Sequence, residues 1–248
     1  MNVVITGAGT GHGLSLVKLF LKYNYKVYAL DKTFHKYFKN SLNKNLKIIQ
    51  IDLLKTDKFD EILRDNLKKN HIDCLINNAR AGLRKNFFKE DSNNFDLSIN
   101  VNLKSDFFFS RSIIPYLKKN KSSIINISSV LGHYIGNESP GYHLSKYAII
   151  SLTKLMAYNL KAYGIRVNCI SPGFLIKNEN IKLFNSNKNK TYKKKVFNTI
   201  LTSDIGYSKD LFNTIEFLIS RNSKFVNGEN IILDGGSHSV NVDPFIDL

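Results

Sequence analysis

The chain has 248 residues, of which 43% are hydrophobic, so it can bury one large core without help from crosslinks. It contains no run of eighteen apolar residues and starts without a basic leader, which argues against a membrane-spanning helix and a targeting signal. The formal net charge of +16 would permit binding to nucleic acid, but the lysines are spread over most of the chain, so a solvated surface is preferred.

Short β-branched runs alternate with segments of helical periodicity along the chain. The runs are almost continuously apolar, as expected for parallel strands that are covered by helices on both faces. They are Asn2–Thr6, Tyr25–Leu30, Leu46–Ile51, Ile72–Asn77, Ser123–Ser128, Ile165–Ile170 and Asn230–Leu233. The predicted fold is α/β: a Rossmann-type, doubly wound parallel sheet of about seven strands with helices on both faces, formed by residues 1–248 as one domain.

Five segments between these strands carry apolar residues at helical spacing and are expected to pack on the sheet. They are Leu14–Tyr23, Lys58–Lys69, Val101–Lys119, Tyr142–Tyr163 and Lys209–Ser220. Residues 174–207 break the rhythm, because this segment is long, rich in Lys and Asn, and shows no clear strand. Long irregular segments in compact domains are commonly lids or linkers, so we predict a substrate lid over 174–207.

The first predicted strand runs into a glycine-rich turn that opens a helix. Such a start directs backbone N–H groups and the positive end of the helix dipole at a pyrophosphate. The spacing is T-G-x-x-x-G-x-G and differs from G-x-G-x-x-G, and a purely structural turn is the alternative interpretation. The turn residues expected to contact a dinucleotide are Gly7, Gly9, Thr10, Gly11, His12 and Gly13.

The next two strands each lead into a carboxylate. Asp31 follows the glycines by roughly 20 residues, where an acid can accept hydrogen bonds from the adenosine ribose. Asp52, with Leu53 beside it, ends the third strand and is expected to meet the adenine. A carboxylate at Asp31 would repel a 2′-phosphate, which favours NAD over NADP, although the adjacent Lys32 could reach a phosphate. An ordinary loop carboxylate is the alternative for Asp31.

A tyrosine and a lysine four residues apart open the helix predicted at 142–163, so Tyr142 and Lys146 share one face. A tyrosine hydroxyl, with an ordinary pKa of about 10, shuttles protons poorly at neutral pH unless a nearby cation stabilises its phenolate. The Y-x-x-x-K pattern is common by chance, but Ser129 follows a buried strand and would project from the same edge of the sheet. Ser128 is the competing serine.

Together these residues resemble the classical short-chain dehydrogenase/reductase family, including its 3-oxoacyl-acyl-carrier-protein reductases, over nearly the whole chain. Besides the glycine turn and the Ser129, Tyr142 and Lys146 set, four further segments carry the resemblance. They are Asn77-Asn78-Ala79, Val101-Asn102-Leu103, Pro172-Gly173 and Asp234-Gly235-Gly236.

The resemblance implies an oxidoreductase that transfers a hydride between NAD or NADP and a carbinol or carbonyl carbon. In it Tyr142 would be the general acid or base, Ser129 would hydrogen-bond the reacting oxygen, Lys146 would hold the nicotinamide ribose and Asn102 would position a relay water. A homotetramer or homodimer packed through the two long helices is also implied, and no metal is. The further cofactor contacts that it implies are Asn78, Ala79, Tyr142, Lys146, Pro172 and Gly173.

Two residues depart from the family pattern: Arg80 replaces the usual glycine after Asn-Asn-Ala, and Lys177 replaces a threonine that usually contacts the carboxamide. Each adds a positive charge near the place where a phosphate or an anionic substrate would lie, which bears on the nicotinamide-side geometry and on the cofactor preference. The lysines of 174–207 would also attract an anion, although outward-facing lysines are the preferred interpretation.

Two other functions remain: a nucleotide-sugar epimerase or dehydratase, which Thr10 disfavours because that class has glycine there, and a non-catalytic dinucleotide-sensing protein. The substrate is a small molecule, with a 3-oxoacyl thioester, a sugar or polyol and a steroid-like alcohol all open. His133, Tyr134 and Phe174 are candidate pocket residues. Neither nucleic acid nor membrane is an expected partner.

Cys74 and Cys169 lie in apolar strands, which fits buried thiols in a reducing cytoplasm.

Overall fold

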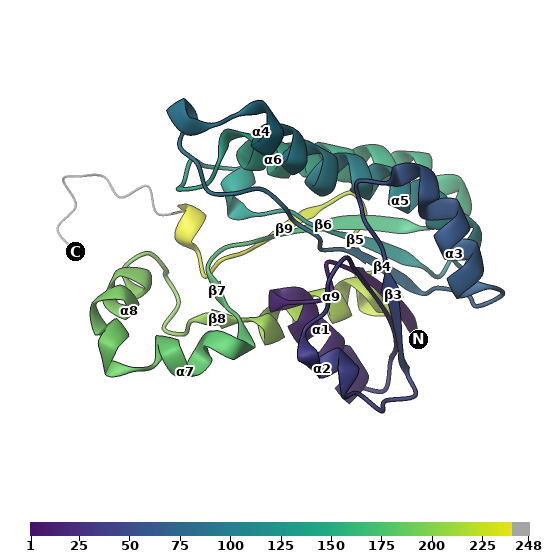
Figure 1. Ribbon diagram of the computed structural model, residues 1–248, viewed down its shortest axis with the longest axis horizontal. Coiled ribbons are helices and arrows are strands. Elements are labelled where there is room, and N and C mark those ends of the chain that lie inside the picture. Colours follow the sequence, from purple (N-terminus) through teal and green to yellow (C-terminus); the bar gives the residue numbers. More distant parts are fainter. Residues whose placement is uncertain (240–248) are drawn as a thin grey trace.

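Seven parallel strands form the central sheet of the computed structural model, which describes residues 1–239 (Figure 1). They are β1 (Asn2–Thr6), β2 (Lys26–Asp31), β3 (Leu46–Gln50), β4 (Cys74–Asn77), β5 (Ser123–Ile127), β6 (Arg166–Pro172) and β9 (Asn230–Leu233). Their order is β3-β2-β1-β4-β5-β6-β9, which confirms the predicted doubly wound sheet. The order reverses between β1 and β4, and ligands of such sheets bind at the carboxyl edge beside this point. Residues 240–248 of the predicted domain lie outside the described residues.

Helices cover both faces of the sheet (Figure 1). One face carries α1 (Gly11–Lys22), α2 (Lys36–Lys39) and α9 (Ser208–Ile219). The other carries α3 (Phe59–Leu67), α4 (Ser92–Ile99), α5 (Ser105–Ile113) and α6 (Pro140–Asn159). No helix within residues 1–239 is long and apolar enough to cross a membrane.

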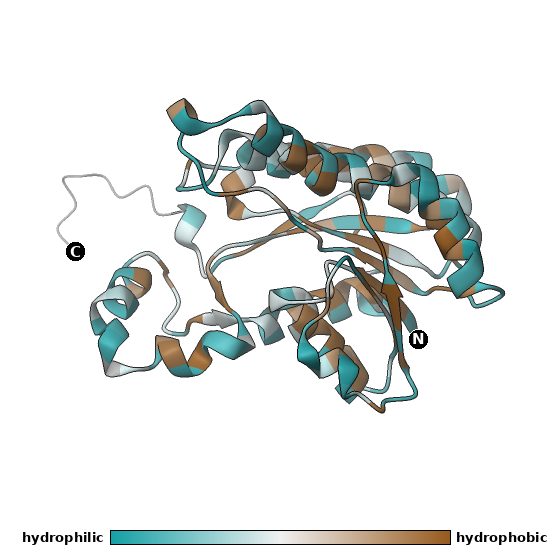
Figure 2. Cartoon of the chain, viewed as in Figure 1, coloured by the Kyte–Doolittle hydropathy of each residue, from teal (hydrophilic) through white to brown (hydrophobic). Residues whose placement is uncertain are grey.

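The alternation of side chains along β1 explains why its sequence is apolar throughout. Val3 and Ile5 are buried against α1 and α9, whereas Val4 is buried in the second core, between the sheet and helices α3, α5 and α6. Successive residues of a strand point to opposite faces, so a strand covered twice needs apolar residues at every position. Figure 2 shows the hydrophobic residues concentrated on the strands and on the helix sides that face them.

The predicted helices differ from the structure at two places. The segment predicted as one helix over Val101–Lys119 starts as a π-helical turn at Asn100–Lys104, continues as α5 and ends in a 3-10 turn at Ile114–Tyr116. Helix α4, directly before it, was missed. Its N-cap Asp91 accepts a 2.9 Å hydrogen bond from the backbone N–H of Asn94, but its Ser and Asn residues are weak helix formers and hide the periodicity.

The segment 174–207 is more ordered than the predicted irregular loop. It contains β7 (Leu175–Ile176), α7 (Ile181–Phe184), α8 (Lys190–Phe197) and β8 (Gly206–Tyr207), with β7 paired to β8. A small core holds it together, formed by Ile176, Phe184, Val196 and Ile205. These four residues lie far apart in the chain, so no local periodicity reveals them.

Both cysteines are buried in strands, as the sequence indicated. Cys74 lies in β4 and Cys169 in β6, and burial raises the pKa of each thiol, to about 12 for Cys169. Each therefore packs as a small protonated hydrophobic residue.

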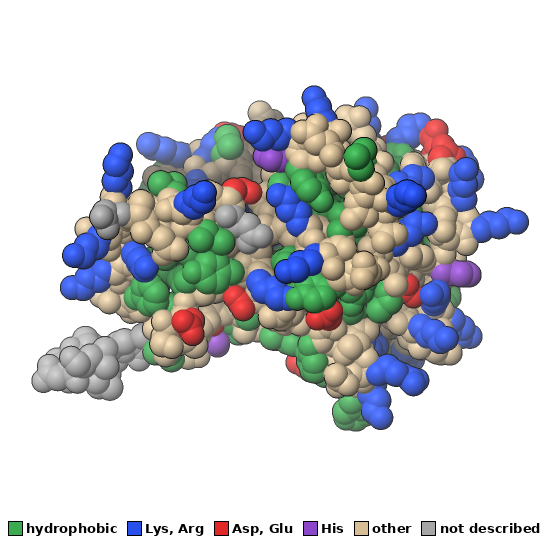
Figure 3. Space-filling view, turned by 90° about the horizontal axis from the view of Figure 1, so that it is seen from below, with side chains coloured by type: hydrophobic (Ala, Val, Ile, Leu, Met, Phe, Trp, Pro, Cys, Tyr) green, Lys and Arg blue, Asp and Glu red, His purple; other side chains and the backbone are tan. Residues whose placement is uncertain are grey.

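Figure 3 shows Lys and Arg side chains scattered over the lower face of the molecule and not gathered in one stripe.

Candidate active site

A cavity of about 1040 Å³ lies along the carboxyl edge of the sheet, beside the point between β1 and β4 where the order reverses. All predicted cofactor-contact residues except Gly9 line it. They are Gly7, Thr10, Gly11, His12, Gly13, Asp31, Asp52, Leu53, Asn78, Ala79, Tyr142, Lys146, Pro172 and Gly173. Ser129 also lines the cavity, whereas Asn102, His133 and Tyr134 do not.

Gly9 faces away from the cavity and fixes the turn instead. Its N–H donates a 2.7 Å hydrogen bond to the Asp31 carboxylate, and a Cβ at this position would lie 1.9 Å from the carbonyl oxygen of Thr33. At Gly13 a Cβ would lie 2.0 Å from the carbonyl oxygen of Gly7. Glycine is therefore required at both positions, and the exposed backbone of the turn can approach a pyrophosphate at the start of α1.

Asp31 and Asp52, the two carboxylates predicted to contact the adenosine, both line the cavity, and Lys32 is bound to Asp52. The Lys32 Nζ donates a 3.0 Å hydrogen bond to Asp52 Oδ2, which lowers the pKa of Asp52. Asp31 Oδ1 accepts the N–H groups of Lys32 and Thr33, at 2.7 and 3.3 Å. A phosphate at this end would meet one carboxylate directly and would have to compete with the other for Lys32.

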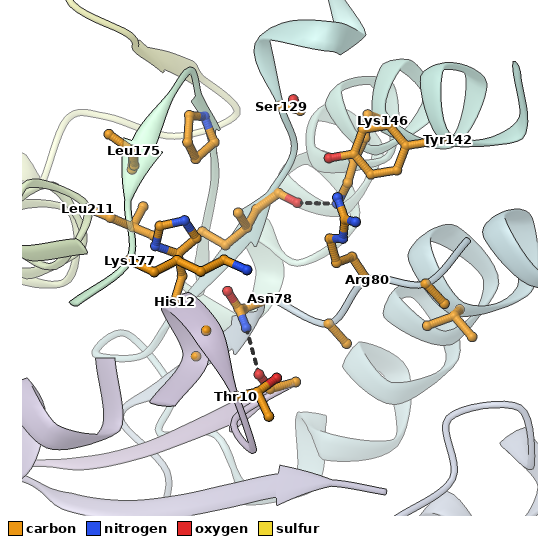
Figure 4. Close-up of a pocket in the computed structure, with 18 of the residues that line it drawn as sticks. Thr10, His12, Asn78, Arg80, Ser129, Tyr142, Lys146, Leu175, Lys177 and Leu211 are labelled. Carbon is orange, nitrogen blue, oxygen red and sulfur yellow. Dashed lines mark hydrogen bonds between the residues drawn. The ribbon is translucent and has the colours of Figure 1, made fainter. Parts of the chain in front are cut away.

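Tyr142, Lys146 and Ser129 meet at the other end of the cavity (Figure 4). Helix α6 begins at Pro140, capped by Ser139, whose hydroxyl accepts the Tyr142 N–H at 3.3 Å. One turn later the buried Lys146 lies with its Nζ 5.7 Å from the centre of the Tyr142 ring, and the Nζ donates to the carbonyl oxygen of Ile127 at 2.8 Å.

The hydrogen bonds of the two adjacent serines separate their roles. The Ser128 hydroxyl donates to the Lys146 carbonyl oxygen at 2.6 Å, so its proton is used to fix α6 on β5. Ser129 Oγ accepts the Leu131 N–H at 3.2 Å, which leaves its own proton for a group in the cavity. The geometry therefore favours Ser129 over Ser128 as the donor to a reacting oxygen.

Asn102 lies behind the wall of the cavity, fully buried in the π-helical turn. Its Oδ1 accepts the Ala81 N–H at 2.7 Å, and its Nδ2 donates to Ser145 Oγ at 3.0 Å. Its side chain thus joins the loop after β4 to α6. Single π-turns within helices are often found at functional sites.

Helix α5 carries a buried carboxyl group, Asp106, which was not singled out from the sequence. Asp106 is almost completely buried, and within residues 1–239 its Oδ2 has no hydrogen-bond partner. Burial raises its pKa to about 8, and the positive charge of Lys146 opposes this shift. Burial therefore favours the protonated form of Asp106. It follows Asn102 by one helical turn, but no pattern in the sequence distinguishes it from an exposed helix acid.

The cavity also receives several residues that the motifs did not include. Arg80 and Arg84, from the loop after β4, line the cavity near Tyr142. Lys177 reaches back over the glycine turn, where its Nζ would lie 3.5 Å from a Cβ at Gly11. The lid segment contributes an aromatic wall, formed by Phe174, Phe184 and Tyr192. Arg80 and Lys177 were visible in the sequence only as departures from a family pattern. Within residues 1–239 no cluster of three or more His, Cys, Asp or Glu could hold a metal.

His12 is held neutral at physiological pH. Burial, followed by the positive charges of Lys177 and Arg80, lowers its pKa from 6.5 to about 4. Its Nδ1 is 2.9 Å from the hydroxyl of Ser208 at the start of α9, so the imidazole links the glycine turn to that helix.

This shift predicts a loss of stability in acid. The unfolded chain takes up a proton on His12 below pH 6.5, whereas the folded chain resists it down to about pH 4. Stability from the neutral imidazole is therefore full above pH 6.5 and decreases as the pH falls towards 4, by about 2 kcal/mol at pH 5. Urea unfolding at pH 7.5 and 5 should show this extra loss in the wild type relative to His12→Leu. Equal losses in both proteins would exclude the effect.

Comparison with known proteins agrees with this geometry. The family model described as short chain dehydrogenase matches residues 1–188. The chain belongs to this family. It is 32% identical over 199 residues to the 2-dehydro-3-deoxy-D-gluconate 5-dehydrogenase of Escherichia coli, covering 79% of this chain and 78% of the relative. It is 31% identical over 248 residues to the 3-oxoacyl-acyl-carrier-protein reductase of Thermotoga maritima, covering 94% and 96%.

Among solved structures, a 4-hydroxyisoleucine dehydrogenase complexed with NADH is similar with a TM-score of 0.85 and 31% identity, covering 96% of this chain and 98% of that one. The protein is thus a short-chain oxidoreductase that transfers a hydride with a nicotinamide dinucleotide. The residues present fit such a cofactor. The glycines of the turn have no side chains to block a pyrophosphate, and the cavity extends from Asp31 to Tyr142.

Proposed function

We propose that this short-chain dehydrogenase reversibly interconverts a carbinol and a carbonyl group of a small-molecule substrate, with NAD as its cofactor. The observation that carries the proposal is the meeting of Ser129, Tyr142 and Lys146 at one end of a cavity whose other end presents Asp31 and Asp52. A bound nicotinamide dinucleotide supplies or accepts the hydride at this catalytic end.

The side chains divide the remaining work. Tyr142 exchanges the proton with the substrate oxygen, and the hydroxyl of Ser129 donates a hydrogen bond to the same oxygen and stabilises its developing negative charge. Lys146 holds the nicotinamide ribose and places a positive charge beside Tyr142. Asn102 positions a water that links Lys146 to solvent. We assign this task to the backbone of its π-helical turn, because its side chain is bonded to Ala81 and Ser145.

A screen of alcohols with NAD⁺ and of ketones with NADH, followed by NADH absorbance, tests the activity directly. The names of the relatives differ in substrate, so the screen should include thioesters, polyols and hydroxy acids. Turnover of at least one class is expected. A folded protein that neither binds NADH nor turns over any class would contradict the proposal.

We expect the enzyme to prefer NADH to NADPH by about tenfold or more in kcat/KM, since the Asp31 carboxylate would repel the 2′-phosphate. The nearest cation, Lys32, is paired with Asp52 at 3.0 Å. Asp31→Asn keeps a hydrogen-bond acceptor for the Gly9 N–H but removes the negative charge. It should therefore reduce the ratio of kcat/KM for NADH to kcat/KM for NADPH. Steady-state kinetics with both cofactors measures this ratio. A wild type that prefers NADPH would show that Asp31 has another role.

We also propose that the protein is a cytoplasmic homotetramer or homodimer. Helix α6 exposes four large side chains along one side, Leu144, Tyr147, Leu155 and Tyr158, and α5 adds Phe107. Such an apolar face favours pairing with a second copy. The buried, protonated thiols of Cys74 and Cys169 suit a reducing compartment.

A further inference from the structure

The charges that line the cavity are divided between its two ends. Its lining carboxylates, Asp31 and Asp52, lie at the adenosine end together with Lys32. The other charged lining residues are all basic: Arg80, Arg84, Lys146 and Lys177. Lys146 is bonded to the Ile127 carbonyl and Lys177 lies over the glycine turn, which leaves the two arginines to face the substrate.

One carboxylate serves both arginines. The side chain of Glu138, which is only 7% exposed, accepts a 2.8 Å hydrogen bond from Arg84 Nε, whereas Arg80 Nη1 is 3.7 Å from the same oxygen. Two guanidinium groups and one carboxylate leave one positive charge. Among the described residues the Arg80 guanidinium makes no hydrogen bond within the protein, although it has five N–H donors.

The guanidinium of Arg80 is also directly beside the catalytic set. Its Cζ lies 5.2 Å from the centre of the Tyr142 ring, and Figure 4 shows the side chain extending toward Tyr142 and Lys146. An acid bound to Arg80 would therefore place its neighbouring carbons next to the Tyr142 hydroxyl. The aromatic wall of Phe174, Phe184 and Tyr192 lines the same cavity and suits the apolar part of such a molecule.

We propose that Arg80 binds a carboxylate of the substrate, and that the substrate is a small hydroxy or oxo acid whose carboxylate lies a few bonds from the reacting carbon. This inference rests on the proposed function. A guanidinium presents parallel N–H groups that match the two oxygens of a carboxylate. Glu138 balances one of the two arginines, so the pair retains one positive charge, which a substrate carboxylate would balance.

The test uses 2-oxo, 3-oxo and 4-oxo acids of three to five carbons, each paired with its methyl ester. Their dissociation constants are measured by calorimetry in the complex with NAD⁺, in which a ketone cannot be reduced, and their kcat/KM is measured with NADH. The variants are Arg80→Gln, Arg80→Lys, and Arg64→Gln as a control with the same charge change on an exposed side chain of α3. Thermal unfolding and NADH binding are followed for every protein.

We expect at least one acid to bind about tenfold or more tightly than its ester. A ratio of this size is what the loss of one charge-assisted hydrogen bond produces. Arg80→Gln should abolish this ratio, Arg80→Lys should restore part of it, and Arg64→Gln should preserve it, all with unchanged NADH affinity. A wild type that binds acids and esters equally, or an Arg80→Gln variant that keeps the ratio, would overturn the inference. The inference would also be overturned if the wild type distinguished dihydroxyacetone phosphate from dihydroxyacetone by a larger affinity ratio than any acid from its methyl ester. Failure to bind NADH would count against the proposed function instead.

Discussion

Replacing Tyr142 by Phe is expected to lower turnover by a factor of about 10² to 10⁴, because in the proposed mechanism the hydroxyl supplies the proton whereas the ring only packs. The ring is buried, with the Lys146 Nζ 5.7 Å and the Arg80 Cζ 5.2 Å from its centre. The affinity for NADH should stay within about twofold of the wild type, since the fold and the glycine turn are untouched. NADH absorbance and fluorescence titration measure the two quantities.

Tyr163→Phe is the matched control, because this tyrosine lies in the 3-10 turn after α6, away from the cavity and from the proposed pairing face, and is 48% exposed. It should leave both quantities unchanged. A Tyr142→Phe enzyme that retained half of the wild-type rate would show that another group moves the proton.

Removing Lys146 should harm both turnover and cofactor binding. In Lys146→Ala the positive charge beside Tyr142 is lost, and so is the ammonium assigned to the nicotinamide ribose, so we expect turnover to fall about 10²-fold or more and NADH affinity about tenfold. The Ile127 carbonyl also loses its 2.8 Å donor, so a lower melting temperature is expected.

Lys154→Ala, an exposed position two turns along the same helix, is the control for Lys146. Circular dichroism of the Lys146 variant separates unfolding from loss of activity. If turnover fell while NADH affinity did not change, Lys146 would act on the proton alone and the ribose contact would be wrong.

The fold was largely predictable because its signals are local. Each strand is buried on both faces, so runs such as Asn2–Thr6 read as continuously apolar, and all seven predicted strands are present. Each of the five predicted helical segments also contains a helix: α1, α3, α5, α6 and α9. Helix α4 was missed, since its polar residues carry no period, and the order within 174–207 depends on a core whose members lie far apart.

The sequence by itself determined the chemistry that one turn or one helix can present: a bare glycine turn before α1, and Tyr142 and Lys146 one turn apart on α6. Only the tertiary structure decided which distant residues meet. In the folded chain the Gly9 N–H is hydrogen-bonded to Asp31, and Asn102 lies behind the cavity wall. Lys32 forms an ion pair with Asp52, and the Arg80 Cζ lies 5.2 Å from the centre of the Tyr142 ring. Local periodicity records whether a side chain is buried, whereas the neighbours of a loop residue depend on the order of the strands, and here that order places β4 between β1 and β5.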